Sequence, residues 1–354
     1  GDDVSAWAPH VERELDTLQQ LAERAPDPIV AALEAAAGRA VFPWPDAALR
    51  PLGCARSSAL PDTERTAHQL AEAPQWSGCV QALTNHHRAA GPGRFARTFA
   101  FIWRDGALQP IDAPDPIRLD ALTGYETQRA AVVRNAEKFV QGLPANNVLL
   151  YGDRGTGKSA TVKALGWAFA AQGLRLVEVQ KDDLEQLPAV LAQLPGAPLR
   201  FIIFVDDLSF GEGDERYKHL KALLEGSLSV RPANVLMMVT SNRRHLLPER
   251  HADRTEGRFG TAEDEVHAQD GIQEKLSLAD RFGLNVVFPS PDQEMFLRIV
   301  TDLARRRGLA LASEELHRRA LQWTRRQRGR SARTAVQFID DLEGELALAA
   351  ALPN

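Results

Sequence analysis

The sequence predicts an α/β protein with a doubly wound parallel sheet, a C-terminal helical lid and an N-terminal accessory region. Three observations predict this architecture. Short apolar runs alternate with helical patterns in the middle of the chain, a glycine-rich loop joins one run to a helix, and the pattern turns wholly helical after Pro291. The 354 residues suffice for two or three domains.

Composition narrows the class of protein. The net charge is only −5, whereas a molecule that binds nucleic acid over its whole surface would be strongly positive. Cys54 and Cys79 are the only cysteines and have no zinc-ligand spacing, which fits a reducing compartment. No apolar run approaches the ~18 residues of a membrane span, and the first residues show no leader pattern, so a cytoplasmic location without membrane contact is expected.

Residues 1–94 are predicted to form a mainly helical accessory region without catalytic residues. Apolar side chains recur there at helical spacing, at Trp7, Val11, Leu15, Leu18 and Ala22. The pair His86-His87 resembles a metal or base motif only superficially, because adjacent side chains point in different directions on a helix. A solvated surface is the preferred interpretation.

Residues 95–118 are predicted to form a hairpin and a linker. The stretch 95–103 is aromatic and β-branched, Asp105-Gly106 is a favoured two-residue turn, and 107–111 returns as a second strand. Two prolines within 112–118 indicate a linker into the next domain.

Residues 119–290 are predicted to form the α/β domain, and 291–354 the helical lid. Nearly continuous apolar runs are typical of parallel strands covered on both faces. The expected strands are 148–151, 174–179, 199–205, 235–240 and 285–288. The lid helices carry apolar residues at Met295, Ile299 and Leu303, at Leu316 and Leu321, and at Val336, Ile339, Leu342 and Leu346.

The strongest functional signal is the loop Gly152-Asp153-Arg154-Gly155-Thr156-Gly157-Lys158-Ser159 between an apolar run and a helical pattern. Its glycines let backbone N–H groups surround a polyphosphate, and the helix N-terminus adds partial positive charge. Lys158 is placed to reach the β- and γ-phosphates and Ser159 to bind Mg²⁺. ATP or GTP is the expected ligand. The alternative is a glycine turn in some other strand-to-helix connection.

Polar residues follow two other predicted strands. Asp206 and Asp207 emerge at the carboxyl end of 199–205, the edge where ligands of such sheets bind. Asp206 is the candidate for holding Mg²⁺, and Asp207 for acting as base toward the attacking water. Asn242, after 235–240, is the candidate for contacting that water or the γ-phosphate. The alternatives are carboxylates that end a strand or cap a helix, and a strand-terminal turn.

Arg281 and Arg333 are cations at the edges of the predicted sheet and lid. A guanidinium group suits the charge that develops on a transferring phosphoryl group, and a neighbouring subunit can supply it. Surface ion pairing is the alternative for both.

Taken together, residues 119–350 resemble a AAA+ ATPase, which implies a P-loop NTPase fold that binds ATP and Mg²⁺. Leu119–Glu126 resembles the family's segment near adenine, Gly152–Ser159 resembles Walker A and Phe201–Asp207 resembles Walker B. Asn242 matches sensor 1, and Arg333 falls where sensor 2 belongs. The string Asp280-Arg281-Phe282-Gly283 is similar to the arginine-finger box of branch-migration motors and replication initiators.

Longer strings at 143–148, 181–184, 206–210 and 240–245, and the hairpin around Trp103, resemble one bacterial branch of AAA+ proteins of unknown function. Two departures from the wider family matter. Asp207 replaces the usual Glu, which predicts slow hydrolysis, with Asp207 still the base and Glu212 a weaker candidate. The connection 180–184 lacks the aromatic, apolar and glycine residues of threading loops, which disfavours peptide threading.

The sequence favours an ATPase that couples Mg-ATP hydrolysis to remodelling or loading of an unidentified macromolecular partner. An ATP-dependent switch or scaffold with little turnover is the alternative. A GTPase is disfavoured because no Asn-Lys-x-Asp string occurs, and a small-molecule kinase because it leaves the arginine finger unexplained. The resemblance implies a homo-oligomeric ring, with six subunits the family habit.

One observation supports nucleic acid as a partner. Residues 303–333 contain ten Arg against two Glu, a formal charge of +8 in an acidic protein. Contact with DNA or RNA is one explanation. The other is that these arginines serve nucleotide and subunit contacts.

Overall fold

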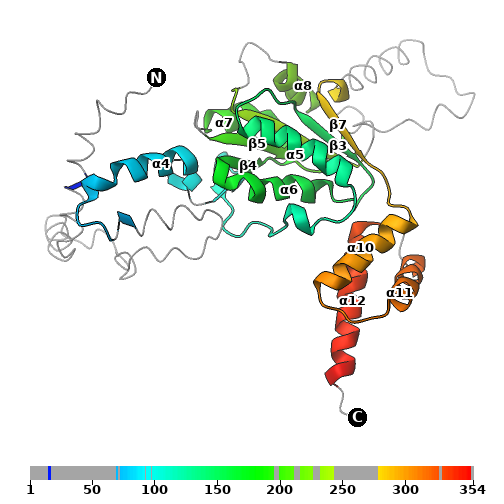
Figure 1. Cartoon of the computed structure of the whole chain (residues 1–354). Helices are drawn as coiled ribbons and strands as arrows, with labels where there is room; N and C mark the ends of the chain where they lie inside the picture. Colours follow the sequence, from blue (N-terminus) through cyan, green and yellow to red (C-terminus); the bar gives the residue numbers. More distant parts are fainter. Residues whose placement is uncertain are drawn as a thin grey trace, which may run out of the picture. The chain divides into compact units, whose positions relative to one another are not determined.

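Figure 1 shows the computed structural model of the chain. The structure describes residues 15–16, 69–70, 72–91, 93–96, 98–194, 199–210, 216–225, 232–242, 278–326 and 329–351. Most of the N-terminal helical pattern (Trp7, Val11, Leu18 and Ala22) lies outside the described residues, as does Glu212.

The chain divides into two compact units, residues 1–99 with 170–173, and residues 100–169 with 174–354. The described elements of the first unit are helical: η3 (Trp76–Cys79), α4 (Val80–Ala90), η4 (Gly93–Ala96) and η6 (Ala170–Gln172). The second unit holds the sheet, its helices and the lid.

The second unit is built on a seven-stranded sheet with the order β2-β1-β4-β5-β6-β3-β7. All neighbouring strands are parallel except the hairpin β1–β2. The strands are β1 (Ala100–Arg104), β2 (Ala107–Pro110), β3 (Val148–Gly152), β4 (Leu174–Glu178), β5 (Arg200–Val205), β6 (Val235–Ser241) and β7 (Leu284–Phe288). Every residue of β6 is buried, as expected for a central strand covered on both faces.

The hairpin β1–β2 belongs to this sheet, which the sequence did not predict. Asp105 and Gly106 both have positive φ angles, 53° and 73°, as a two-residue type I′ turn requires. β1 begins at Ala100 rather than at residue 95 and pairs in parallel with β4, so it covers an edge of β4 that would otherwise be unpaired. The buried Trp103 donates from Nε1 to Gln186 Oε1 at 2.9 Å, which ties the hairpin to the segment after β4.

Helices flank the sheet in the way that alternating strands and helices predict. They are α5 (Glu126–Val140), α6 (Lys158–Phe169), α7 (Leu187–Ala192) and α8 (Tyr217–Glu225). α5 and α6 lie side by side, with α5 also against β7 and α6 against β4 and β6 (Figure 1). Of the described helices, none has both the length and the apolarity to cross a membrane.

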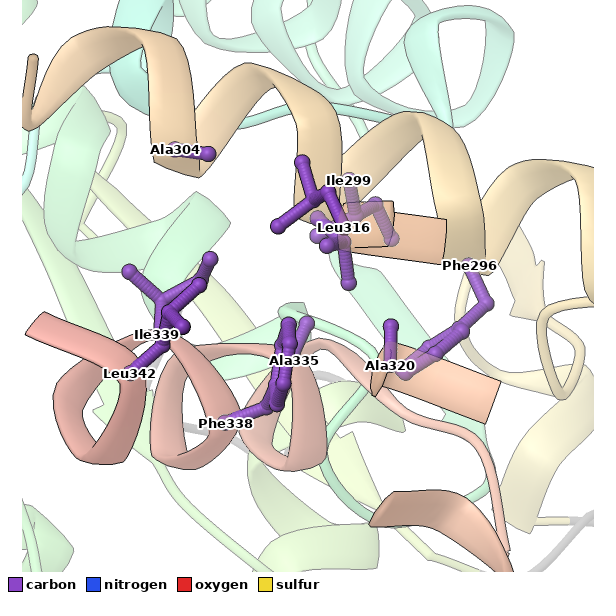
Figure 2. Close-up of a cluster of buried hydrophobic side chains, with 10 residues drawn as sticks. Phe296, Ile299, Ala304, Leu316, Ala320, Ala335, Phe338, Ile339 and Leu342 are labelled. Atoms are coloured by element: carbon purple, nitrogen blue, oxygen red, sulfur yellow. The ribbon is translucent and has the colours of Figure 1, made fainter. Parts of the chain in front are cut away.

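Three further helices form the lid, α10 (Gln293–Arg306), α11 (Ser313–Arg326) and α12 (Ala332–Ala351). α10 begins after Asp292, whose carboxylate accepts from the Met295 N–H at 2.8 Å. Figure 2 shows side chains of all three helices pointing toward one another. This core contains Phe296, Ile299, Val300, Ala304, Leu316, Ala320, Ala335, Phe338, Ile339 and Leu342. Val336 belongs to the predicted apolar pattern but is 37% exposed and lines a cavity instead.

Candidate nucleotide-binding site

The loop of residues 152–159, called the phosphate loop below, connects the end of β3 to the start of α6. Gly152, Gly155 and Gly157 have φ angles of 136°, 74° and 91°, a region that side chains disfavour. A Cβ on Gly152 would lie 1.9 Å from the carbonyl oxygen of Phe288 on β7. Only glycine therefore lets the backbone bend next to the neighbouring strand.

Lys158 is buried at the mouth of this loop, with 5% of its surface exposed. Its ammonium group donates to the carbonyl oxygens of Gly152 at 2.8 Å and Asp153 at 2.7 Å, and to Asn242 Oδ1 at 3.1 Å. Burial lowers the pKa of Lys158, while the nearby carboxylates of Asp207, Asp153 and Asp206 act in the opposite direction. The cation is thus held between the loop and two strand ends.

Asp206 organises the oxygen atoms beside Lys158. Its Oδ1 accepts from Ser159 Oγ at 2.6 Å and from Thr240 Oγ1. Thr240 Oγ1 also accepts from the Asp207 N–H at 2.9 Å. A carboxylate and a hydroxyl at this separation form the type of oxygen pair that Mg²⁺ binds. Sequence reasoning gave no role to Thr240, because nothing in its neighbourhood along the chain reveals that it supports Asp206.

Asn242 links the phosphate loop to Asp207. Its Nδ2 donates to Asp207 Oδ1 while its Oδ1 accepts from Lys158, so one amide contacts both charged groups. Asp207 is exposed and has a φ angle of 49°, the left-handed region that Asp tolerates better than most residues. The structure therefore brings together Lys158, Ser159, Asp206, Asp207 and Asn242, which come from three segments of the chain.

The lid reaches the phosphate loop through the start of α12. The N–H groups of Ala332 and Arg333 donate to the Gly155 carbonyl oxygen at 2.9 and 3.3 Å. The Arg333 side chain is exposed and lines a cavity of about 690 Å³ together with Asp153, Arg154 and Gly155. Arg333 thus lies beside the loop, as its sequence position suggested, but it does not contact Lys158.

A second cavity, of about 100 Å³, lies between the segment Leu119–Glu126, the phosphate loop and the lid. We call Leu119–Glu126 the adenine-side segment. The lining is mainly apolar, as a nucleobase requires. It consists of Ala121, Leu122, Thr123, Tyr125, Arg129, Thr156, Gly157, Thr161, Phe288, Ile299, Leu303, Ala332 and Val336.

Polar contacts hold the adenine-side segment against α10. Asp302 on α10 accepts from Thr123 Oγ1, and Arg298 donates to Glu126 at 3.0 Å. Burial alone would raise the pKa of Asp302, but hydrogen bonds from Thr123, Arg306 and Arg305 outweigh it and lower the pKa. Tyr125 donates to the Pro289 carbonyl oxygen at 2.6 Å, and burial raises its pKa to about 12.

Arg281 lies apart from these residues within one chain. It precedes β7, whereas the phosphate loop follows β3, and β3 and β7 are parallel. Arg281 is therefore at the amino edge of the sheet and the phosphate loop at the carboxyl edge. Asn285 Nδ2 donates to the carbonyl oxygens of Ala279 and Phe282 and so fixes the exposed turn that carries Arg281. Sequence reasoning missed this contact of Asn285.

The connection after β4 contacts the part of the chain that follows β5. The Lys181 ammonium lies 5.9 Å from the centre of the Phe210 ring, and Asp182 forms an ion pair with Arg216. The segment contains no aromatic residue.

The residues fit a magnesium-bound nucleoside triphosphate. The glycine loop and the buried Lys158 suit the phosphates, and the Ser159–Asp206 pair suits the metal ion. The adjoining apolar cavity suits the nucleobase. In the sheet, β3 lies between β6 and β7 and leads into the phosphate loop, β5 and β6 are followed by acidic and polar residues, and a helical lid follows the sheet. Together these features define a AAA+ P-loop protein with a nucleotide-binding domain.

The chain belongs to the family described as "Protein of unknown function (DUF815)", whose family model matches residues 96–346. No curated protein matches it. Among solved structures, the chain is similar to the RuvB Holliday junction branch migration motor of Thermotoga maritima, with 15% identity, 67% of each chain covered and a TM-score of 0.46. It is also similar to the FIGL-1 AAA domain in complex with ADP, with 20% identity, coverage of 58% of this chain and 66% of that chain, and a TM-score of 0.38.

Proposed function

We propose that the protein is a cytoplasmic ATPase that hydrolyses Mg-ATP slowly and uses the energy to remodel or load a macromolecular partner. The observation that carries this proposal is the hydrogen-bonded series Lys158–Asn242–Asp207 beside the Ser159–Asp206 pair. It connects the group expected to hold the phosphates with the carboxylate expected to act on water.

Each residue has a distinct role in this proposal. The N–H groups of the phosphate loop and the Lys158 ammonium bind the β- and γ-phosphates. Ser159 and Asp206 hold Mg²⁺, which supplies positive charge that neutralises the triphosphate. Asp207 orients and deprotonates the attacking water, and Asn242 holds the Asp207 carboxylate in place. Arg333 stabilises charge on the phosphates from the lid.

Slow turnover follows from the short side chain of the proposed catalytic base, Asp207. The Asp207 side chain is one methylene shorter than the Glu usual at this position, and a misplacement of ~1 Å can reduce a rate ~100-fold. Asp207→Asn should abolish turnover and leave Mg-ATP binding intact. Unchanged turnover in this variant would remove Asp207 from the mechanism.

Arg281 supports assembly, because it lies at the sheet edge opposite its own phosphate loop. We infer that it acts on ATP bound to a neighbouring subunit in a homo-oligomeric ring, for which six subunits is the expected number. Arg281→Ala and Lys158→Ala should each be inactive alone. Mixed together, they should regain part of the activity, because the Lys158→Ala subunit still offers its Arg281 to a neighbour.

The mixing experiment has a direct control. Arg281→Ala mixed with Asp207→Asn should also regain activity, since the Asp207→Asn subunit keeps its arginine and its neighbour keeps its base. An Arg281→Ala protein that retains full activity as a monomer would contradict action in trans. Unfolding temperatures of each variant establish that the single substitutions are folded.

An ATP-dependent switch with little turnover is the second candidate. The observation in its favour is that Asn242 already engages the Asp207 carboxylate, which leaves that short side chain less reach toward a water. Steady-state turnover measured with and without candidate partners separates the two. A switch binds ATP in both conditions and hydrolyses it in neither.

A further inference from the structure

The apolar cavity of about 100 Å³ has a few polar side chains in its lining, and these decide how a base can be held there. The other lining residues are apolar or glycine, so a hydrogen bond from a side chain to the base has to come from the polar ones. Each can contribute only the donors and acceptors that its contacts within the protein leave over. The polar side chains are Thr123, Tyr125, Arg129, Thr156 and Thr161.

Four of these side chains are hydroxyls that already donate within the protein. A hydroxyl has a single proton, so none of the four can donate to a base without losing its present contact. The pairs are Thr123 with the Asp302 carboxylate, Tyr125 with the Pro289 carbonyl oxygen at 2.6 Å, Thr156 with the Asp153 carbonyl oxygen at 2.9 Å, and Thr161 with the Gly157 carbonyl oxygen at 2.9 Å.

Arg129 differs from the hydroxyls because a guanidinium group has five N–H donors. It lies in the first turn of α5, and 13% of its side chain is exposed. One terminal nitrogen donates to the Gly124 carbonyl oxygen, and the other lies 4.0 Å from a Glu126 carboxylate oxygen. No further acceptor contacts the guanidinium among the described residues, so Arg129 lines the cavity with donors to spare.

The spare donors of Arg129 are costly where they lie. Burial lowers the pKa of Arg129, and the nearby Glu126 carboxylate acts in the opposite direction. The guanidinium nevertheless stays protonated at neutral pH. An N–H group that is withdrawn from water costs free energy unless an acceptor reaches it. The ring nitrogens N1, N3 and N7 of adenine are acceptors of this kind, so a bound base can remove that cost.

The adenine-side segment fixes the direction of the Arg129 side chain. Besides lying near Arg129, Glu126 accepts from the Gly124 N–H at 3.0 Å through the same carboxylate oxygen. Its other oxygen accepts from Arg298 of the lid at 3.0 Å. Gly124 and Glu126 therefore hold the guanidinium at the cavity wall, whereas Arg298 binds the same carboxylate from outside the cavity lining.

We propose that Arg129 donates to a ring nitrogen of the bound purine and thereby fixes the base in the cavity. The inference rests on the proposed function, since it requires that the site binds ATP. It adds a base-contacting residue to the groups that hold the phosphates and the magnesium ion. Among the side chains of the cavity lining, Arg129 alone has donors left for a base, so recognition by side-chain donors depends on it.

The test titrates the full chain calorimetrically with Mg-ADP and with three ADP analogues in which N1, N3 or N7 is replaced by carbon. ADP carries the same base as ATP and is not consumed during the titration. One analogue should bind the unmodified protein at least about tenfold more weakly than ADP, because it lacks the acceptor for a charged donor. In Arg129→Met, ADP should weaken by about the same factor, and all three analogues should bind within about threefold of ADP.

Arg298→Met is the matched control, because it removes a guanidinium from the same Glu126 carboxylate but outside the cavity lining. It should keep the penalty on the same analogue. The Tm of each variant establishes that it is folded. If Arg129→Met does not fold, Arg129→Gln takes its place with the same expected loss of the penalty, since its amide can still donate to the Gly124 carbonyl oxygen.

Three results would overturn the proposal. Binding of all three analogues as tightly as ADP would show that no ring nitrogen accepts a hydrogen bond from the protein. A penalty that persists in Arg129→Met would assign the contact to the backbone around the cavity. Loss of the penalty in Arg298→Met as well would reduce the effect to the packing of the lid against Glu126.

Failure of the proposed function is distinguishable from failure of this inference. If Mg-ADP gives no heat with the unmodified protein, nucleotide binding itself is refuted, and the base contact with it. If Mg-ADP binds and no analogue is penalised, only the contact of Arg129 is refuted.

Discussion

Removal of the Asn242 amide should slow ATP hydrolysis with little effect on ATP binding. In the structure this amide accepts from the Lys158 ammonium at 3.1 Å and donates to the Asp207 carboxylate. A hydrogen bond to a charged group contributes about 1.5–3 kcal/mol. If that contribution is made in the transition state, Asn242→Ala should lower kcat by about 10- to 150-fold.

The assay is steady-state phosphate release over a range of Mg-ATP concentrations. Asn242→Ala should reduce kcat and leave KM within about threefold, because the phosphate loop still binds ATP. Asn85→Ala, on an exposed position of α4, is the matched control and should behave like the unmodified protein. A kcat within twofold of that of the unmodified protein, or a rise in KM without a fall in kcat, would refute the reasoning.

Two further predictions concern stability. Gly152→Ala should lower the free energy of unfolding by about 3 kcal/mol or more, because the residue has a φ angle of 136° and the new Cβ would lie 1.9 Å from the Phe288 carbonyl oxygen. Denaturant unfolding measures this free energy. A loss below about 1 kcal/mol would contradict the close packing of Gly152 against β7. Asp302 has a lowered pKa in the folded protein, so its contribution to stability is complete above about pH 4 and decreases as the pH falls toward the folded-state value. The difference in Tm between the unmodified protein and Asp302→Asn should therefore be largest near pH 6 and shrink below pH 4; a difference that stays constant with pH would show that the Asp302 charge is not what holds α10 to the adenine-side segment.

The sequence predicted the parts of the fold that depend on local patterns. Apolar runs located β3 to β7 within one or two residues, and the glycine spacing located the loop before Lys158. The pairing of β1 with β4 was not predicted, because the partner of a strand at a sheet edge depends on contacts distant in the chain. The hairpin was therefore separated from a sheet to which it belongs.

The candidate site shows the same division. Asp206, Asp207 and Asn242 could be selected because each follows a buried strand, and the carboxyl ends of parallel strands meet at one edge. Thr240 and Asn285 could not, since their roles depend on hydrogen bonds that appear only in the folded chain.

Calorimetric titration with Mg-ATP tests the central claim most directly, since every proposed role depends on the phosphate loop binding a nucleotide. The unmodified protein should give saturable heat with one site per chain, and Lys158→Ala, shown to be folded by its Tm, should give none. Absence of heat from the unmodified protein, or equal binding by Lys158→Ala, would contradict the account.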